Sequence, residues 1–406
     1  MNVCVVGLGY IGLPTALLLA KAGNSVAGYD VVKHKIDMLD SGRLPFEEAG
    51  LRELFVSAGD NFHAVSALVE ADVYIVAVPT PVTADKLCDL SYVESAVRSL
   101  IPFIRKGVLV VLESTVRPGT TVGVVKPILE ESGLRAGVDF SIAYVAEKAI
   151  PGNTLYEMVH NDRIIGRFDG AGAERARQLY SSFVKGSLIV ADCTVVETVK
   201  LVENAYRDVN IAFANELAVI CAKRGMDVWE VIQLANRHPR VNVHQPGPGV
   251  GGHCIAIDPW FLVEGFSDTL VSAARKVNDS MPAYVVSVVD SMLKSKKGKV
   301  AVLGAAYKKN VDDARESPSE RLAVLFREKG YEVSVTDPYV KVFPERLLSF
   351  EDAVDGAAAV VVAVDHDCYK EKGALLSSLE KRGVIVFDAG NLFNGRFKTI
   401  GRDGYA

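Results

Sequence analysis

The first thirty residues constrain the fold more than any other stretch of the chain. Residues 2–6 are a short apolar run, and residues 7–12 read Gly-Leu-Gly-Tyr-Ile-Gly. The helical pattern LPTALLLAKAG follows and ends at Gly23, and a second apolar run, SVAGYD, ends at Asp30. A strand, a tight glycine turn, a helix and a second strand in this order predict the start of an α/β fold with a parallel sheet.

The glycine turn also predicts a nucleotide site. The three glycines have the spacing that lets backbone N–H groups approach a pyrophosphate at a helix N-terminus. Asp30 ends the next strand, where a carboxylate accepts hydrogen bonds from ribose hydroxyls and repels a 2′-phosphate, so NAD is preferred to NADP. The alternative is an ordinary glycine-rich turn beside a solvated aspartate. The predicted NAD-binding residues here are Gly7, Gly9, Tyr10, Ile11, Gly12 and Asp30.

A long helix is predicted in the middle of the chain. Residues 194–225 keep helical periodicity for about thirty residues, and Thr194 and Glu197 have capping-box spacing at the start. At 1.5 Å per residue such a helix is roughly 45 Å long, which is more than a small domain needs. We therefore expect it to join two domains and to pack against a second subunit.

The second half of the chain repeats the pattern of the first. The polar, basic stretch at 292–299 is the best linker candidate, and four apolar runs, at 300–308, 331–340, 357–366 and 383–391, follow it. Their order matches the runs at 3–12, 25–30, 72–81 and 107–115. The predicted fold is therefore two Rossmann-like, doubly wound parallel-sheet domains joined by a long central helix and a small helical domain. The expected boundaries are 1–190, 191–295 and 296–406.

Charge and composition point to a small-molecule partner. The 45 Lys and Arg residues and 50 Asp and Glu residues give a net charge of -5 without long runs of one sign, so no nucleic-acid or membrane partner is expected. The chain enters strand patterning directly, and no apolar run reaches the length of a membrane span. The six cysteines are scattered singly, which favours a reducing cytoplasm.

Cationic residues replace the glycines in the second half. The segment LGAAYKKNVDDARES has one glycine, Gly304, where the first half has three, and it contains Lys308, Lys309 and Arg315. These side chains either bind the phosphates of a different ligand or are solvated surface residues. The second half alone leaves the two interpretations equal.

The long helix carries a second polar candidate pair. Lys200 and Asn204 are four residues apart and so share one face of the helix, among apolar neighbours. Lysine on a helix is usually a surface residue, but an ammonium and an amide on one face also suit the stabilisation of an oxyanion. The helix alone favours the surface interpretation.

The segment GPGVGGHCIAIDPWF, residues 247–261, raises the question of what Cys254 does. Zinc needs about four ligands and only His253 lies nearby, so a metal site is not expected. A thiol in a glycine-rich loop is either a small core residue or a nucleophile that backbone N–H groups activate. Asp258, four residues later, shares a face with it if the segment is helical, although Pro259 limits the helix to a short turn. An NAD fold with a cysteine nucleophile predicts oxidation of an aldehyde through a thioester.

Motifs along the whole chain resemble the UDP-glucose/GDP-mannose dehydrogenase family. They are GLGYIGLP at 7–14, VPTP at 78–81, EST at 113–115, ETVKLVENAYRDVNIAFANEL at 197–217, GPGVGGHCIAIDP at 247–259 and YKKNVDDARESPS at 307–319. The resemblance implies an NAD-dependent, four-electron oxidation of the C6 alcohol of a nucleotide sugar to a carboxylate, with two NAD per sugar and no metal. It also implies a homodimer built on the long helix.

The same resemblance implies roles for individual residues. Cys254 is the implied nucleophile, Lys200 and Asn204 stabilise oxyanions, and Asp258 assists proton transfer through water. Thr115 and Glu147 are the implied residues for positioning that water and for thioester hydrolysis. Lys35, Thr80 and Thr115 join the implied cofactor site. The implied substrate-binding residues are Glu147, Lys200, Asn204, Arg240, His244, Gly251, Lys308 and Arg315, with Arg240 or His244 reaching the neighbouring subunit's substrate.

One segment distinguishes subgroups of the family. UDP-glucose enzymes have a second glutamate four residues after the first, whereas this chain has Pro151 four residues after Glu147. The segment is similar to members that act on N-acetylated UDP-hexosamines. Within that group, the loop VNVHQPGPGVGGHCIAIDPWF at 241–261 is most similar to members that act on UDP-N-acetylmannosamine. The expected substrate is UDP-N-acetylmannosamine, with UDP-N-acetylglucosamine second and UDP-glucose third.

Overall fold

The computed structural model describes residues 1–150, 152–294 and 298–402. The chain divides into two compact units, residues 1–203 with 260–264, and residues 204–259 with the chain from 265 onward. Their boundary falls inside helix α8 (Cys193–Lys223), so the helical middle of the chain belongs mostly to the second unit. Pro151, and residues 295–297 of the predicted linker, lie outside the described residues.

The described residues of the first unit form a sheet of eight strands in the order β3-β2-β1-β4-β5-β6-β7-β8. The strands are β1 (Asn2–Val6), β2 (Ser25–Tyr29), β3 (Phe62–Val65), β4 (Val73–Val76), β5 (Leu109–Leu112), β6 (Ser141–Val145), β7 (Arg163–Arg167) and β8 (Leu188–Asp192). The helices are α1 (Gly12–Lys21), α2 (Lys33–Asp40), α3 (Leu51–Ala58), α4 (Ser91–Leu100), α5 (Lys126–Glu130), α6 (Thr154–His160) and α7 (Gly170–Tyr180). Strand order reverses direction between β1 and β4, which is where a doubly wound sheet binds its ligand.

One pairing departs from the predicted parallel sheet. Strand β7 runs antiparallel to β6, and β8 then pairs parallel to β7. The remaining neighbours in this sheet are parallel, as the alternation of apolar runs and helical stretches predicts. An antiparallel strand near the edge of an otherwise parallel sheet is common in folds of this kind.

The second unit contains a second doubly wound sheet, with strand order β10-β9-β11-β12-β13 among the described residues. Its strands are β9 (Lys299–Leu303), β10 (Glu332–Thr336), β11 (Ala357–Val362), β12 (Ile385–Asp388) and β13 (Lys398–Thr399). Its helices are α9 (Val228–Ala235), α10 (Asp258–Leu262), α11 (Leu270–Met292), α12 (Pro318–Glu328), α13 (Phe350–Val354) and α14 (Gly373–Lys381), with α10 shared with the first unit. The switch point of this sheet lies between β9 and β11.

Both faces of the second sheet are covered by helices. In β9, Val300 and Val302 pack with Phe326 of α12, whereas Ala301 and Leu303 pack in a separate core that includes α13 and α14. This alternation follows from the two-residue period of a strand and explains the continuous apolar runs in the sequence.

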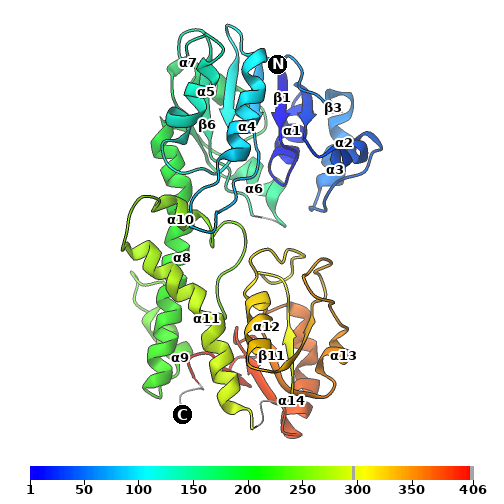
Figure 1. Ribbon diagram of the computed structural model, residues 1–406, viewed down its shortest axis with the longest axis vertical. Coiled ribbons are helices and arrows are strands. Elements are labelled where there is room, and N and C mark those ends of the chain that lie inside the picture. The colour runs from blue at the N-terminus through cyan, green and yellow to red at the C-terminus, as the bar shows by residue number, and fades with distance from the viewer. Residues whose placement is uncertain (151, 295–297, 403–406) are drawn as a thin grey trace. The chain divides into compact units, whose positions relative to one another are not determined.

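Helices α8 and α11 lie side by side in the second unit (Figure 1) and are joined by buried polar groups. Asp208 of α8 accepts from Arg275 at 2.6 Å and from Asn278 at 2.7 Å. Asn278 accepts from Asn215 at 2.8 Å, and Asn215 in turn accepts the N–H of Gly247 at 2.9 Å. The two helices therefore fix the start of the glycine loop that carries Cys254.

Helix α8 begins differently from the prediction. The Asp192 carboxylate accepts the N–H of Thr194 at 2.9 Å and so caps the helix. Glu197 is fully buried, and its carboxylate accepts the N–H of Thr121 at 2.8 Å and its hydroxyl at 2.6 Å. The predicted capping box is therefore wrong, because Glu197 binds the start of the segment η3 (Thr121–Val125) instead of its own helix.

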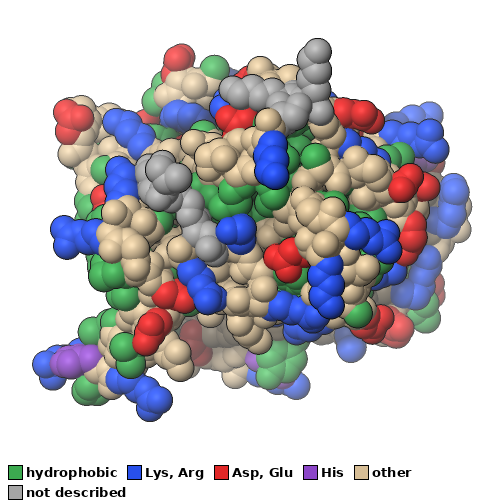
Figure 2. Space-filling view, turned by 90° about the horizontal axis from the view of Figure 1, so that it is seen from below, with side chains coloured by type: hydrophobic (Ala, Val, Ile, Leu, Met, Phe, Trp, Pro, Cys, Tyr) green, Lys and Arg blue, Asp and Glu red, His purple; other side chains and the backbone are tan. Residues whose placement is uncertain are grey.

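Charged side chains of both signs are interspersed on the face drawn in Figure 2. None of the described helices combines the length and the apolar character that a membrane crossing requires.

Candidate active site

The glycine turn after β1 has the geometry of a dinucleotide site. Gly7 has a φ of 99°, which favours glycine, and a Cβ on Gly12 would lie 1.8 Å from the carbonyl oxygen of Gly7. A Cβ on Gly9, in contrast, would meet no protein atom within 4 Å. The first and third glycines are therefore required by the fold, whereas the second leaves open space where a pyrophosphate approaches.

Asp30 lies beside this turn. Its carboxylate accepts the N–H of Leu8 at 2.9 Å, the N–H of Val32 at 2.8 Å and the ammonium of Lys35 at 2.7 Å. Burial raises the pKa of Asp30, but the hydrogen bonds from Lys35 and the backbone outweigh burial and lower it. On the other side of the switch point, Thr80 follows β4 and donates to the carbonyl oxygen of Thr115 at 2.6 Å. The residues of the predicted cofactor site therefore fit an NAD molecule, with an ionised carboxylate for the ribose.

The substitution Gly9→Ala tests cofactor binding separately from the stability of the fold. Because the added methyl group meets no protein atom, we expect the melting temperature to stay within about 2 °C of the unaltered chain. The methyl group occupies the approach to the pyrophosphate, so NADH affinity should fall by about tenfold or more. Fluorescence titration with NADH, beside a thermal melt, measures both. Unchanged NADH affinity would show that the turn does not face the cofactor.

Glu147 is part of a buried charge network in the first unit. Its side chain follows β6 and accepts from Arg163 and from the N–H groups of Lys148 at 2.6 Å and Ala149 at 2.7 Å. Arg163 also donates to Glu113 at 3.2 Å, and both of these side chains are nearly inaccessible to solvent. One arginine therefore bridges two carboxylates, and the position of Glu147 depends on Glu113. The sequence patterns did not predict roles for Glu113 and Arg163, although a glutamate at a strand end in EST was a visible signal.

Glu113 links this network to the cofactor helix. Its carboxylate accepts from Tyr180 at 2.7 Å and from Thr15 of α1 at 3.1 Å. Burial, helped by the charge of Glu147, raises the pKa of Glu113 to about 7 against the opposing effect of Arg163. Glu113 therefore titrates close to neutral pH.

Glu113→Gln should weaken the pH dependence of stability. A carboxyl group whose pKa is higher in the folded than in the unfolded chain binds more protons when folded, so the unfolding free energy falls as pH rises from about 4.5 to about 7. Glutamine does not titrate, so the change in urea midpoint between about pH 5 and about pH 7.5 should be smaller in the variant. Equal changes in both proteins would contradict this assignment.

The second unit brings together Asn204, Cys254 and Asp258. Asp258 donates its N–H to the carbonyl oxygen of Cys254 at 2.9 Å, so a helical turn joins the two residues, as their spacing allowed. Asn204 Nδ2 donates to Asp258 Oδ2 at 2.6 Å, and both side chains are buried. Cys254 itself is exposed, so the core-thiol interpretation is wrong.

Two residues of α8, Lys200 and Arg207, lie within one helical turn of Asn204. Lys200, one turn before Asn204, is only 7% exposed, so it is not the surface lysine that the helix alone favoured. Arg207, three residues after Asn204, donates to Asn204 Oδ1 and thereby orients the amide so that Nδ2 faces Asp258. The sequence patterns did not predict a role for Arg207, although its helical spacing from Asn204 was a signal.

The glycines next to Cys254 have structural tasks. A Cβ on Gly251 would lie 2.4 Å from the carbonyl oxygen of Glu316, and one on Gly252 would lie 2.8 Å from the ring of Tyr307. The N–H of Gly252 donates to the carbonyl oxygen of Arg315 at 3.1 Å. The N–H of Gly252 is therefore not one of the backbone groups free to activate the thiol. The cysteine loop instead packs tightly on the segment after β9.

A pocket opens at the switch point of the second sheet. Its volume is about 180 Å³, and residues 245–249, 306–308, 318–319, 363–365 and 390 line it. Among the predicted substrate residues, Lys308 is in this lining. Arg315 pairs with Asp313 at 2.6 Å outside the lining, Gly251 also lies outside it, and Lys309 is exposed. Arg240 is exposed and His244 half-buried, and neither lines the pocket.

Within the described residues, no group of three His, Cys, Asp or Glu side chains is arranged to hold a metal ion.

An open dinucleotide turn on one sheet and a pocket at the switch point of a second are features of an NAD-dependent dehydrogenase that also binds a nucleotide-linked substrate. The chain belongs to the UDP-glucose/GDP-mannose dehydrogenase family. Models of the family's NAD binding domain, central domain and UDP binding domain match residues 1–184, 194–280 and 301–395.

Several relatives are similar over nearly their whole length. A UDP-N-acetyl-D-mannosamine dehydrogenase of Methanococcus maripaludis is 44% identical, with 96% of this chain and 93% of that protein covered. An NDP-N-acetyl-D-galactosaminuronic acid dehydrogenase of Ralstonia nicotianae is 43% identical, with 95% of each covered. The solved structure of a UDP-D-ManNAc dehydrogenase from Pyrococcus horikoshii has a TM-score of 0.92 at 38% identity, with 99% of each chain covered.

Proposed function

We propose that this chain oxidises the C6 alcohol of UDP-N-acetyl-D-mannosamine to a carboxylate, consuming two NAD and one water per sugar. The observation that carries the proposal is the full-length likeness to UDP-N-acetyl-D-mannosamine dehydrogenases at 42–44% identity. The exposed thiol of Cys254, one helical turn from Asp258, supplies the group that a four-electron oxidation needs.

In the first oxidation the C6 hydroxyl loses a proton and C6 loses a hydride, which leaves an aldehyde. The residues of the glycine turn would hold NAD, which would supply the hydride acceptor for each of the two oxidations. Lys200 and Asn204 share one face of α8, where an ammonium and an amide N–H stabilise the developing alkoxide. Asp258 takes up the hydroxyl proton through water.

The second oxidation passes through Cys254. Its thiolate adds to the aldehyde carbon and forms a C–S bond, and the carbonyl oxygen becomes the oxyanion of a thiohemiacetal. Loss of a second hydride from C6 gives a thioester. Water then adds to the thioester carbon, the C–S bond breaks, and the carboxylate leaves while the thiolate is regenerated. Glu147, held by Arg163 and two backbone N–H groups, serves this hydrolysis.

The nucleotide of the substrate is assigned to the pocket of the second sheet. The pocket lies at the switch point, and residues 306–308, 318–319, 363–365 and 390 of its lining belong to the segment that matches the family's UDP binding domain. Lys308 supplies a positive charge. Gly251, Arg240, His244 and Arg315 remain proposed contacts to the sugar nucleotide from outside the pocket lining.

We further propose a homodimer in the cytoplasm. Tyr206, Phe213 and Ile220 of α8 are 65%, 49% and 41% exposed, and their seven-residue spacing gives the long helix an apolar stripe. A second copy of α8 is the proposed occupant of that stripe, which would bring Arg240 or His244 to the neighbouring subunit's substrate. The singly scattered cysteines support a reducing compartment.

A panel of sugar nucleotides tests the proposed substrate. UDP-N-acetylmannosamine should have a kcat/KM at least about tenfold above UDP-N-acetylglucosamine, UDP-N-acetylgalactosamine and UDP-glucose. The galactosamine sugar is included because the Ralstonia relative is nearly as similar as the methanococcal one. A preference for any of the other three sugars would contradict the proposal.

A further inference from the structure

The two sheets carry matching carboxylates. Asp30 follows β2 and Asp337 follows β10, and each accepts a hydrogen bond from the turn after the neighbouring strand, at 2.9 and 2.6 Å. Both turns begin with a left-handed glycine, Gly7 with a φ of 99° and Gly304 with a φ of 98°. The second sheet therefore keeps the backbone of a dinucleotide turn and its acidic partner, although it lacks the two later glycines.

The two carboxylates differ in the side chain that binds them. Asp30 binds Lys35, whose side chain is 31% exposed, whereas Asp337 binds Nε2 of His366 at 2.9 Å and both side chains are fully buried. Although burial raises the pKa of Asp337, the hydrogen bonds from His366 and the backbone lower it to about 2. The carboxylate of the second sheet is therefore bound by a fully buried imidazole, whereas the carboxylate of the first sheet is bound by a partly exposed ammonium.

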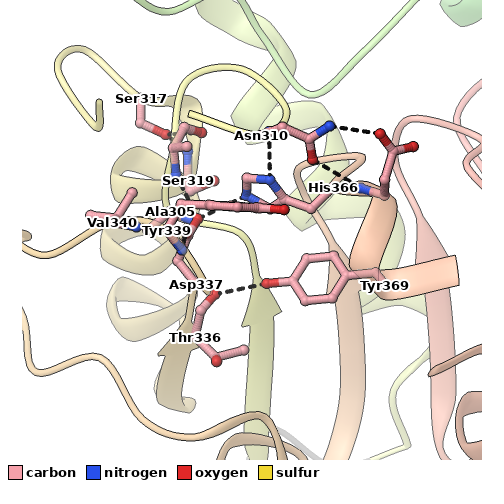
Figure 3. Close-up of polar contacts among 12 residues, drawn as sticks. Ala305, Asn310, Ser317, Ser319, Thr336, Asp337, Tyr339, Val340, His366 and Tyr369 are labelled. Atoms are coloured by element: carbon pink, nitrogen blue, oxygen red, sulfur yellow. Dashed lines mark hydrogen bonds and ion pairs between the residues drawn. The ribbon is translucent and has the colours of Figure 1, made fainter. Parts of the chain in front are cut away.

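His366 connects that carboxylate to the loop after β9. The backbone N–H of Asn310 lies 2.8 Å from Nδ1 of His366, and because a backbone N–H only donates, Nδ1 accepts. Nε2 therefore carries the proton and donates to Asp337, so the ring is neutral and held in one tautomer. Figure 3 shows the ring lying between Asn310 and Asp337.

Asn310 is held by its side chain as well. Its Nδ2 donates to Asp367 Oδ2 at 2.6 Å, and its Oδ1 accepts the N–H of Asp367 at 3.1 Å. Its φ of 59° is a left-handed conformation that asparagine tolerates. Three hydrogen bonds therefore join the loop after β9 to the loop after β11.

Both of these loops line the pocket. The first contributes Tyr307 and Lys308, and the second contributes residues 363–365. Asn310 lies two positions beyond Lys308, and His366 lies one position beyond Asp365. The hydrogen bonds between the two loops therefore fix the spacing of two walls of the pocket.

We propose that His366 is a positioning residue for the nucleotide: by holding Asn310 against the loop after β11, it sets the spacing of the pocket walls and hence the affinity for UDP. The inference rests on the proposed function, which places the nucleotide in this pocket. His366 touches neither the sugar nor the cofactor in this assignment, so it acts on binding and leaves the oxidation unchanged.

The test measures binding of UDP and of NADH to the full chain by calorimetry. His366→Phe keeps a ring in the buried site but removes both ring hydrogen bonds, while Asp337 retains four backbone donors. We expect the Kd for UDP to rise about tenfold and the Kd for NADH to stay unchanged. With the sugar nucleotide, KM should rise similarly and kcat should not change.

Two further variants separate positioning from packing. His366→Gln supplies an amide oxygen as acceptor and an amide N–H as donor, and it should restore UDP affinity to within about threefold. Tyr369→Phe is the matched control, because its ring packs edge-on against His366 and its hydroxyl binds the backbone of Thr336 and Gly304 instead of Asn310 or Asp337. It should leave UDP affinity unchanged.

Unchanged UDP affinity in His366→Phe would overturn the inference. An equal loss of UDP and NADH affinity would also overturn it, because that pattern reports general loss of structure. If the unaltered chain does not bind UDP, the proposed function fails at this pocket and the inference falls with it.

Discussion

Cys254→Ser is expected to lower the rate of carboxylate formation by about 10⁴-fold. A serine hydroxyl loses its proton far less readily than a thiol. In the same exposed turn it therefore does not add to the aldehyde as a thiolate does. UDP and NADH should bind with Kd values within about twofold of the unaltered chain, because the side chains are nearly the same size. Product assay and binding titration measure the two effects.

Cys368→Ser is the matched control. Cys368 is a partly buried thiol in the second unit, outside the pocket lining, and its replacement should leave turnover within about twofold. Normal turnover by Cys254→Ser would show that Cys254 is not the nucleophile.

Lys200→Met should lower kcat by about 10² to 10³-fold, which is the usual effect of removing one oxyanion donor. Methionine matches the length of the lysine stem without its charge, so the nearly buried site on α8 stays filled. In the proposed mechanism the lost interaction belongs to the alkoxide and thiohemiacetal stages, so KM for the sugar nucleotide should change little. Steady-state kinetics separates the two constants.

Lys223→Met provides the comparison on the same helix, because Lys223 lies in the last turn of α8 and is exposed. Its kcat should equal that of the unaltered chain. Equal losses of kcat in Lys200→Met and Lys223→Met would contradict the oxyanion role. A rise in KM without a fall in kcat in Lys200→Met would contradict it as well.

Local patterns in the sequence predicted four strands of each sheet and part of the site. The apolar runs became β1, β2, β4 and β5 in the first unit, and β9 to β12 in the second. The four-residue spacing of Cys254 and Asp258 became a helical turn, because a hydrogen bond between nearby residues depends only on local chain geometry.

Contacts between distant residues were not predictable in the same way. Glu113 and Arg163 are fifty residues apart, and their pairing depends on how β5, β6 and β7 align in the sheet. Burial of Lys200 likewise depends on what packs against α8, since the sequence of a helix specifies its faces but not their neighbours. The predicted capping box at Glu197 was wrong for the same reason, because the carboxylate binds Thr121, which is distant in the sequence, instead of its own helix.

The ratio of NADH formed to UDP-N-acetylmannosamine consumed tests the central claim most directly. If Cys254 carries the sugar from aldehyde to thioester before hydrolysis, a limiting amount of sugar should yield two NADH per molecule, with the uronate as the only sugar product. One NADH per sugar, with free aldehyde accumulating, would contradict a four-electron oxidation by this chain.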